Sequence, residues 1–318
     1  MSKHNQNRMI GVNVHHKGTK AYGEAYTETY TRLAAELGCT IYRINYNPTN
    51  DSMVCYIRSI IDSCHNYGMK VMLSLDNLHG TEEEIHDRMV YTAEQLSDCV
   101  DYFQIFNETD VWCAMTDENK FYDSSDWTGM STGYYNPERV KICVKKMGAA
   151  LSAFRKTAPD AKLVVNIGSR HFPMLDWYIA AGLSWDIIAF DIYEIGLWDH
   201  TQFFDMMAAR YPGYDFMVAE CNYPSNDGPY TEEQQAEWLR TFFHIMDEYE
   251  SDRMLGIIIY ELMDQPNIQA GDSWSGEAHF GIVNTHTDYT PGEPKLAYYE
   301  VQKLLRAYTA NRAAEQKA

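Results

Sequence analysis

The chain has 318 residues, of which 45% are hydrophobic and 14% aromatic, so it can bury a large core and has the length of one barrel or two modest domains. Its 26 Lys and Arg residues against 45 Asp and Glu residues give a net charge of -19. That charge argues against nucleic acids and anionic membrane surfaces as partners, whereas neutral ligands such as sugars remain compatible with it. We expect a monomer.

The beginning of the chain and the cysteines bear on the cellular compartment. Residues 1–8 are polar and lead directly into an apolar strand, and no stretch has the apolar length of a signal peptide or a membrane span. The seven cysteines include no CxxC pair, and most fall on apolar positions of expected helices or at strand starts, which favours reduced, buried thiols over disulfides. The sequence therefore predicts a cytoplasmic protein, or a secreted one if a leader was removed.

Short apolar segments alternate with amphipathic ones along the whole chain. The expected strands are 9–14, 40–45, 70–76, 101–108, 162–167, 186–193, 215–220 and 255–261. The expected helices are 26–37, 54–64, 85–96, 137–154, a short one after Pro173, 203–207, one that begins at Thr231 and one from about Pro294 to Tyr308.

Several of these helices carry recognisable ends. Gly38 is expected to end the first helix, and Pro137 suits the first turn of another. Thr231-Glu232-Glu233-Gln234 has the pattern of a capping box, in which the first and fourth side chains satisfy each other's backbone N–H groups.

Eight alternating strand and helix units predict an α/β fold, a single-domain (β/α)₈ TIM barrel over residues 1–308, with a frayed tail over 309–318. The alternative is an open doubly wound sheet. Such a sheet would favour a glycine-rich turn after the first strand, and Gly11 and Gly18 do not form that fingerprint.

In such a barrel the functional side chains gather at the carboxyl ends of the strands. Polar residues are dense at these positions on otherwise apolar strands, and burying them without a function would require a hydrogen-bond partner for each. They are His15, His16, Arg43, Asn45, Asp76, His79, Asn107, Glu108, Asn166, Asp191, Tyr193, Glu220, Tyr260 and Glu261. Two of them, Glu108 and Glu220, end the fourth and seventh strands.

These residues resemble glycoside hydrolase clan A, the retaining barrels with an acid/base glutamate after strand four and a nucleophilic glutamate after strand seven. Phe106-Asn107-Glu108 matches the first and Val218-Ala219-Glu220 the second, while Tyr42-Arg43-Ile44-Asn45 is similar to the strand-two arginine segment. Asp191-Ile192-Tyr193 is similar to the strand-six His-x-Tyr of family five, and His79 lies where that family has a histidine. The stretch 280–298 resembles the end of several bacterial clan-A barrels, so the resemblance spans nearly the whole chain.

The resemblance implies a double-displacement mechanism without cofactor or metal, with a carbohydrate as the partner. Glu220 would attack the anomeric carbon with Arg43 as its neighbouring cation, and Glu108 would protonate the leaving oxygen and then activate water. Asn107 would bind the sugar 2-hydroxyl, and Tyr193 would donate a hydrogen bond to Glu220. The two carboxyl groups would lie about 5–5.5 Å apart, as in other retaining enzymes.

One departure concerns strand eight, where clan members usually carry a tryptophan that floors the sugar site. Here Tyr260-Glu261-Leu262 occupies that position, so either Tyr260 or Trp274 would supply the platform. Membership of a family-39-like or unassigned branch is therefore as plausible as membership of family five. Further aromatic platforms could come from the loop over residues 109–136, which contains Trp112, and from Trp198.

Alternatives remain at this point. The adjacent His15 and His16 point to opposite sides of a strand, so they do not chelate a metal together, and a metal-dependent barrel hydrolase is disfavoured. A non-catalytic carbohydrate-binding barrel derived from such an enzyme is the main alternative. Trp198 and Trp274, in loops after different strands, slightly favour endo action on a polysaccharide or oligosaccharide, while the sugar and its linkage cannot be deduced.

Overall fold

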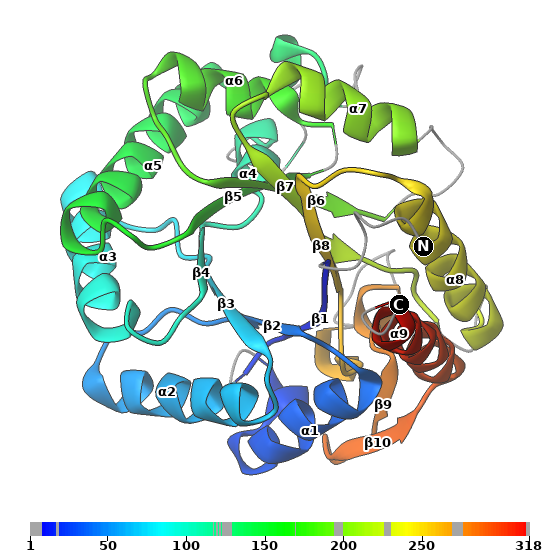
Figure 1. Cartoon of the computed structure of the whole chain (residues 1–318). Helices are drawn as coiled ribbons and strands as arrows, with labels where there is room; N and C mark the ends of the chain where they lie inside the picture. Colours follow the sequence, from blue (N-terminus) through cyan, green and yellow to red (C-terminus); the bar gives the residue numbers. More distant parts are fainter. Residues whose placement is uncertain are drawn as a thin grey trace. The chain divides into compact units, whose positions relative to one another are not determined.

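The computed structural model describes residues 8–16, 19–116, 118, 120, 122, 129–168, 170–193, 200–225, 230–268 and 276–315. The barrel strands are β1 (Met9–Val14), β2 (Ile41–Asn45), β3 (Lys70–Leu75), β4 (Tyr102–Ile105), β5 (Leu163–Gly168), β6 (Ile187–Ile192), β7 (Asp215–Cys221) and β8 (Met254–Ile259). They form a closed barrel in sequence order (Figure 1). The predicted (β/α)₈ fold is confirmed, and the open doubly wound sheet is excluded.

The helices that alternate with these strands are α1 (Thr27–Leu37), α2 (Asp51–Asn66), α3 (Glu82–Leu96), α5 (Pro137–Thr157), α6 (Phe172–Ala180), α7 (His200–Arg210), α8 (Glu232–Glu248) and α9 (Leu296–Glu315). The end signals act as expected. Gly38 closes α1 in the left-handed conformation with φ 104°, and Thr231 and Gln234 form a reciprocal capping box at α8.

Three local features differ from the expectation. The loop after β4 begins with a short helix, α4 (Thr109–Ala114). A helix of six residues is too short to produce a recognisable hydrophobic periodicity in the sequence. Pro294 belongs to an antiparallel hairpin of β9 (Val283–Thr285) and β10 (Pro291–Pro294), so α9 begins two residues later than expected. The backbone of α9 then continues to Glu315, beyond the expected end at Tyr308.

By contacts the chain divides into two compact units, each built from separate segments. The first unit comprises Met1–Asn45, Asp62–Val71 and Ile192–Ala318, and thus β1, β2, β7 and β8. The second unit comprises Tyr46–Ile61 and Met72–Asp191, which contain β4, β5 and most of β3 and β6.

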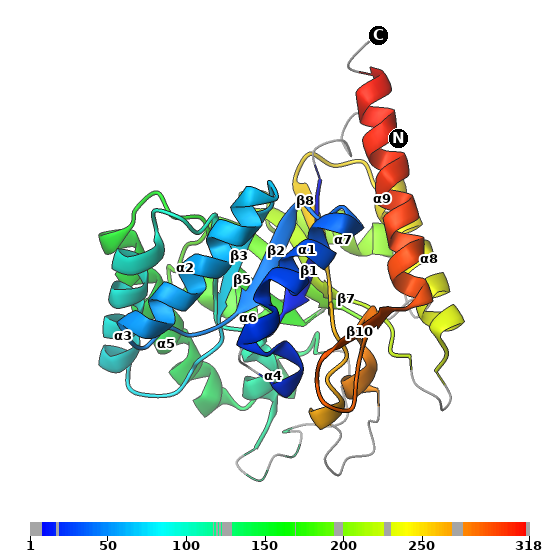
Figure 2. The same ribbon diagram turned by 90° about the horizontal axis from the view of Figure 1, so that it is seen from below.

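In the first unit, β1 pairs in parallel with both β2 and β8. Two glycines allow the backbones to approach, because a Cβ on Gly11 would lie 2.2 Å from the carbonyl oxygen of Ile41 and one on Gly256 would lie 2.2 Å from that of Met9. Helices α8 and α9 lie side by side in both views (Figures 1 and 2). In the second unit, α3 packs on α5.

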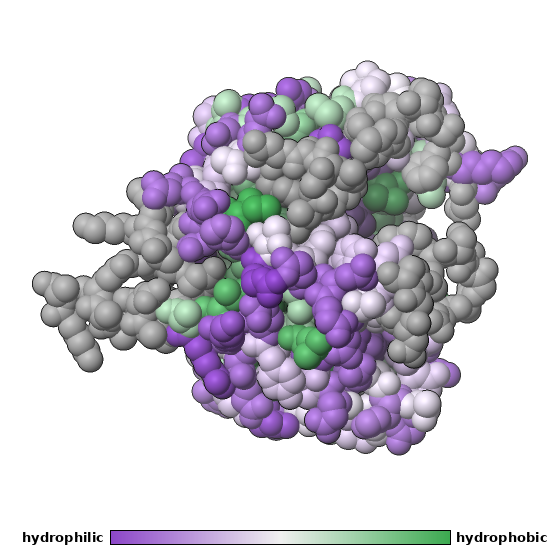
Figure 3. Space-filling model, turned by 90° about the vertical axis from the view of Figure 1, so that its right-hand side faces the viewer, coloured by the Kyte–Doolittle hydropathy of each residue, from purple (hydrophilic) through white to green (hydrophobic). Residues whose placement is uncertain are grey.

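The strands are buried along nearly their whole length, as in a parallel sheet covered by helices. On the face shown in Figure 3, hydrophilic side chains dominate the coloured surface and hydrophobic ones form small separate patches. Within the part of the chain described, all seven cysteines are free thiols, and five of them are buried. None of the described helices combines the length and the apolar character that crossing a bilayer requires.

Candidate active site

The glutamate that ends β7 is held by two side chains of its own unit. Glu220 is 5% exposed, and its Oε1 accepts a 2.7 Å hydrogen bond from Nη1 of the fully buried Arg43. Its Oε2 accepts a 2.6 Å hydrogen bond from the hydroxyl of Tyr193. Both contacts were expected from the sequence. The carboxylate is therefore fixed in orientation and its negative charge is compensated.

Arg43 is itself positioned by β1, since the same Nη1 donates a 3.0 Å hydrogen bond to Oδ1 of Asn13. Asn13 and Arg43 are register partners in the parallel β1–β2 pair. The amide of Asn13 also contacts Nε2 of His15 at 3.1 Å. We refer to Asn13, Arg43, Tyr193 and Glu220 as the Glu220 cluster.

The two adjacent histidines lie in different surroundings. His16 contacts the hydroxyl of Tyr42 at 2.8 Å, while Nε2 of His15 lies 3.6 Å from Oε2 of Glu261. Burial lowers the pKa of each imidazole to about 3, with the charge of Arg43 acting in the same direction on His15. Both rings are neutral at pH 7. Within the described ranges no three His, Cys, Asp or Glu residues form a metal-binding group.

Tyr260, one of the two residues expected to form an aromatic platform for the sugar, is buried. Tyr260 is 9% exposed, and its ring makes edge contacts with Tyr193, His15 and Phe280. Its hydroxyl donates a 3.1 Å hydrogen bond to Glu277. The ring thus contributes to the wall behind the Glu220 cluster, with little open face of its own.

Glu261 was expected to contact substrate, but it is fully buried. Its carboxyl accepts hydrogen bonds from the hydroxyl of Tyr22 at 2.8 Å and from Nε2 of Gln265 at 2.5 Å. Burial raises the pKa of Glu261 well above its usual value. These contacts tie the residue into the core of the first unit and leave it no exposed surface.

A further carboxyl group was not found from the sequence. Glu277 is half-buried and begins a short 3-10 helix (Glu277–His279) before β9, where no strand end marks it. Burial and the nearby charge of Glu220 raise the pKa of Glu277, against the hydrogen bond from Tyr260. Glu277 is thus electrostatically coupled to Glu220.

In the second unit, the glutamate that ends β4 has a left-handed backbone with φ 40° and ψ 50°. Such a conformation is costly for a residue other than glycine, and it occurs preferentially at functional sites. The backbone N–H of Glu108 donates a 2.7 Å hydrogen bond to Oδ1 of Asn166, and Nδ2 of Asn166 donates one of 2.5 Å to Asp191. Residues of β5 and β6 thus fix the turn that presents Glu108.

Two residues near Glu108 were not identified from the sequence. Asp110, in α4, is fully buried and accepts a 3.1 Å hydrogen bond from the backbone N–H of Gly168 at the end of β5. Nδ1 of His171 forms an ion-pair contact with the same carboxylate oxygen. The position of His171, just after the fifth strand, would have been the signal.

The remaining candidates are spread over both units. In the second unit, Asn107 is half-buried with its Oδ1 bound by Gln104, and His79 is exposed in the loop after β3. Trp112 lies under the guanidinium of Arg139, 4.9 Å from the ring centroid, which is a packing contact. Asn45 ends β2 in the first unit and is half-buried. Trp198 and Trp274 lie outside the described residues.

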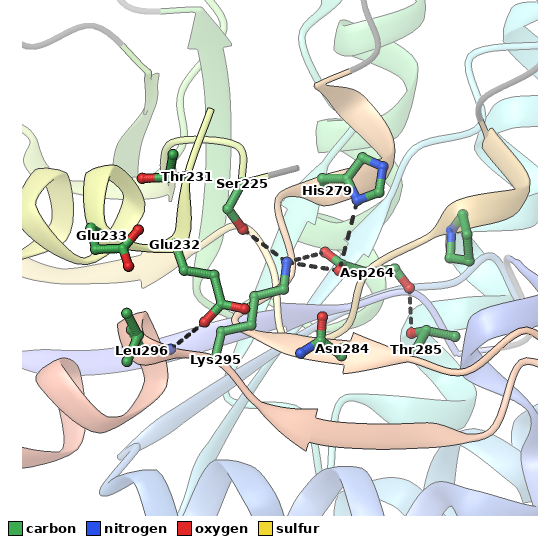
Figure 4. A pocket seen from close by; sticks show the side chains of 11 residues that line it. Ser225, Thr231, Glu232, Glu233, Asp264, His279, Asn284, Thr285, Lys295 and Leu296 are labelled. Carbon is green, nitrogen blue, oxygen red and sulfur yellow. Dashed lines mark hydrogen bonds and ion pairs between the residues drawn. The ribbon is translucent and has the colours of Figure 1, made fainter. Parts of the chain in front are cut away.

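The first unit also contains a polar pocket of about 480 Å³ (Figure 4). At its base, Nζ of the buried Lys295 lies 2.7 Å from both oxygens of Asp264 and 3.0 Å from Oγ of Ser225. Glu232, at the start of α8, accepts the backbone N–H of Leu296 at 2.9 Å. These contacts join the beginnings of α8 and α9 to the segment after β8, and every donor of the ammonium group has a partner.

No protein-family profile and no protein of curated function matches the sequence. Among solved structures, the fold is similar to Fpglu1 from Fervidobacterium pennivoraus, with a TM-score of 0.70, 13% identity, and 95% of this chain and 96% of that chain covered. The hyperthermophilic β-glucosidase from Pyrococcus furiosus gives a TM-score of 0.69 and 12% identity, with 97% of this chain and 96% of that chain covered.

The family 1 β-glucosidase from Thermotoga maritima gives a TM-score of 0.67 and 10% identity, with 95% of this chain and 98% of that chain covered. At these identities the likenesses establish the fold of this chain. They do not confirm the resemblance to families five and 39.

Proposed function

We propose that this protein is a retaining glycosidase in which Glu220 is the nucleophile and Glu108 is the acid/base. The observation that carries the proposal is the environment of Glu220. Its carboxylate is oriented by Arg43 and Tyr193 through hydrogen bonds of 2.7 and 2.6 Å, so both of its oxygens are fixed near the carboxyl end of β7.

The strand order supports the pairing of the two glutamates. β4 and β7 belong to one closed parallel barrel, in which all carboxyl ends share one rim. Retention requires the two carboxyl groups to approach to about 5–5.5 Å, and that separation is part of the proposal. The left-handed backbone of Glu108 further supports a functional role, because this conformation is costly for a residue other than glycine and is enriched at functional sites.

In the proposed reaction the carboxylate of Glu220 attacks the anomeric carbon while the carboxyl proton of Glu108 passes to the leaving oxygen. The glycosidic C–O bond breaks and a glycosyl ester forms on Glu220. Glu108, now a carboxylate, takes a proton from water, which hydrolyses the ester and restores both groups. Tyr193 and Arg43 stabilise the Glu220 carboxylate before attack and after release.

For the substrate we propose a β-linked oligosaccharide or polysaccharide. Three of the structures of similar fold are named as β-glucosidases or a β-glycosidase, which supports a β linkage. The expectation of endo action depended on Trp198 and Trp274, which lie outside the described residues, so substrate length is left to experiment.

The test is sugar release from β-glucans, mannans, galactans and xylans and from aryl β-glycosides. Release by the wild type should fall at least about 10³-fold in Glu220→Ala. Glu293→Gln, which changes an exposed glutamate, is the matched control and should retain full activity. Release that survives in Glu220→Ala would refute the nucleophile. Binding of a glycan without release would instead support the carbohydrate-binding barrel.

A further inference from the structure

We propose that Asp110 and His171 form a charge pair that governs the protonation of Glu108, acting as positioning residues for the acid/base. The inference rests on the proposed function, in which Glu108 is the catalytic acid/base. All three residues belong to the second unit, and their arrangement is described by contacts within that unit.

The backbone fixes Asp110 relative to Glu108. Helix α4 begins at Thr109, directly after the left-handed Glu108, and the backbone N–H of Val111 bonds to the carbonyl of Glu108. Asp110 therefore occupies the first turn of α4 with no freedom to move away. A 2.7 Å hydrogen bond between Thr109 and Tyr178 attaches the same turn to α6.

Three ionisable groups surround a single glycine. An ideal Cβ on Gly168 would lie 3.0 Å from Oδ2 of Asp110, 3.7 Å from Nδ1 of His171 and 3.8 Å from Oε1 of Glu108. Oε1 of Glu108 and the Asp110–His171 pair therefore adjoin the same glycine, and charges at such short range interact in a half-buried site. A side chain at position 168 would fill the space that the three groups share.

The imidazole of His171 is held in a closely fitting site. The rings of Tyr134 and Tyr135 contact it edge-on, with centroids 5.6 and 5.9 Å away. Gly129 has φ 68°, and a Cβ there would lie 2.2 Å from Nε2 of His171, so its backbone lies directly against the ring. The hydroxyl of Tyr135 donates a 2.7 Å hydrogen bond to the Gly129 carbonyl and secures that contact. His171 cannot turn away from Asp110.

The charge state of the pair sets the effect on Glu108. With His171 protonated the pair is neutral, and without that proton it carries one negative charge, which favours a proton on Glu108. Among the described residues of the second unit, other ionisable groups near the pair include Cys113 and Cys143, which interact electrostatically with Asp110. Arg139 lies near Cys113, Asp191 lies behind Asn166, and Arg170 precedes His171 in the chain.

Two variants are expected to move the proton affinity of Glu108 in opposite directions. Asp110→Asn removes the anion while keeping an acceptor for the Gly168 N–H, so Glu108 should lose its proton at lower pH. His171→Gln removes the only one of the two groups that can carry a positive charge beside Asp110, so Glu108 should lose its proton at higher pH. Each shift should be about one pH unit. A residue that only supported the fold would produce no shifts of opposite sign.

The test is a ¹³C NMR titration of protein labelled at the glutamate side-chain carboxyl, with Glu108→Gln to assign the signal. Asp160→Asn, which removes an exposed aspartate of the same unit, should leave the titration unchanged. Unchanged or equally directed midpoints in Asp110→Asn and His171→Gln would overturn the inference. If Asp110→Asn does not fold, His171→Gln alone decides by the direction of its shift.

Kinetics then separate the two proposals. In an active enzyme the basic limb of kcat/KM should shift with the NMR midpoint in each variant. It should shift for glycosides with poor leaving groups, whereas activated aryl glycosides should be little affected, because their departure needs no proton. A wild type that cleaves no glycoside would refute the proposed function, while the titration would still decide whether the pair controls Glu108.

Discussion

Arg43 and Glu220 form a buried ion pair, with Nη1 of the guanidinium 2.7 Å from Oε1 of the carboxylate and side-chain exposures of 0% and 6%. Removing one partner of such a pair leaves a charge without compensation in a poorly solvated place. Arg43→Met should therefore lower the free energy of unfolding by about 3 kcal/mol or more. Urea unfolding followed by circular dichroism measures this.

The double variant Arg43→Met, Glu220→Gln is the control for that loss. It removes the uncompensated charge together with the guanidinium, so it should recover most of the lost stability although it is inactive. If the double variant were as unstable as Arg43→Met, the loss would come from packing of the arginine side chain and not from the carboxylate.

Tyr193→Phe should reduce kcat/KM by roughly 10- to 100-fold, because a hydrogen bond to a charged group contributes roughly 1.5–3 kcal/mol. The lost contact is the 2.6 Å bond to Oε2 of Glu220. Tyr67→Phe is matched to it, since Tyr67 donates a 2.7 Å hydrogen bond to Glu28 at the surface. Steady-state kinetics of both variants decide the matter, and equal effects would argue against a role of Tyr193 at the nucleophile.

Glu108→Gly should be more stable than Glu108→Ala by about 1 kcal/mol, although both should be impaired in catalysis. The reason is the left-handed backbone at this position, which glycine adopts without a Cβ clash. Chemical denaturation of the two variants measures the difference. Equal stability would indicate that the surrounding contacts relieve the strain at Glu108.

Glu261→Gln should gain stability relative to the wild type as pH rises. The pKa of Glu261 is raised by burial, so the folded state retains a proton that the unfolded chain loses above about pH 4.5. Wild-type stability therefore declines from that pH upward until Glu261 ionises in the folded state. Unfolding free energies of both proteins between pH 4 and 8 test this, and a constant difference would exclude the linkage.

Much of the barrel follows from the sequence, because eight apolar strands alternate with amphipathic helices whose caps are marked by Gly38 and Thr231. The contacts of Glu220 with Arg43 and Tyr193 were also predicted, from the resemblance of their strands to those of clan-A barrels. Strand ends are the positions that barrel geometry brings to one rim.

Other parts of the site depend on contacts that leave no periodic signal. Asp110 lies on a helix of six residues, and its partner His171 lies 61 residues later, beside Gly168 at the end of β5. Glu277 lies on a 3-10 helix of three residues, and its partner Tyr260 comes 17 residues earlier in the sequence. Glu261 was misjudged because its partner Tyr22 comes from a connection 239 residues earlier, which no local pattern indicates.

The central claim is that Glu220 forms a covalent bond with the sugar during turnover. The most direct test is intact and peptide mass spectrometry after incubation with 2-deoxy-2-fluoro-β-glycosides that carry a good leaving group. The account predicts a stable adduct of one fluoroglycosyl group on the peptide that contains Glu220. Sugar release that proceeds without any adduct, or an adduct on a different residue, would contradict it.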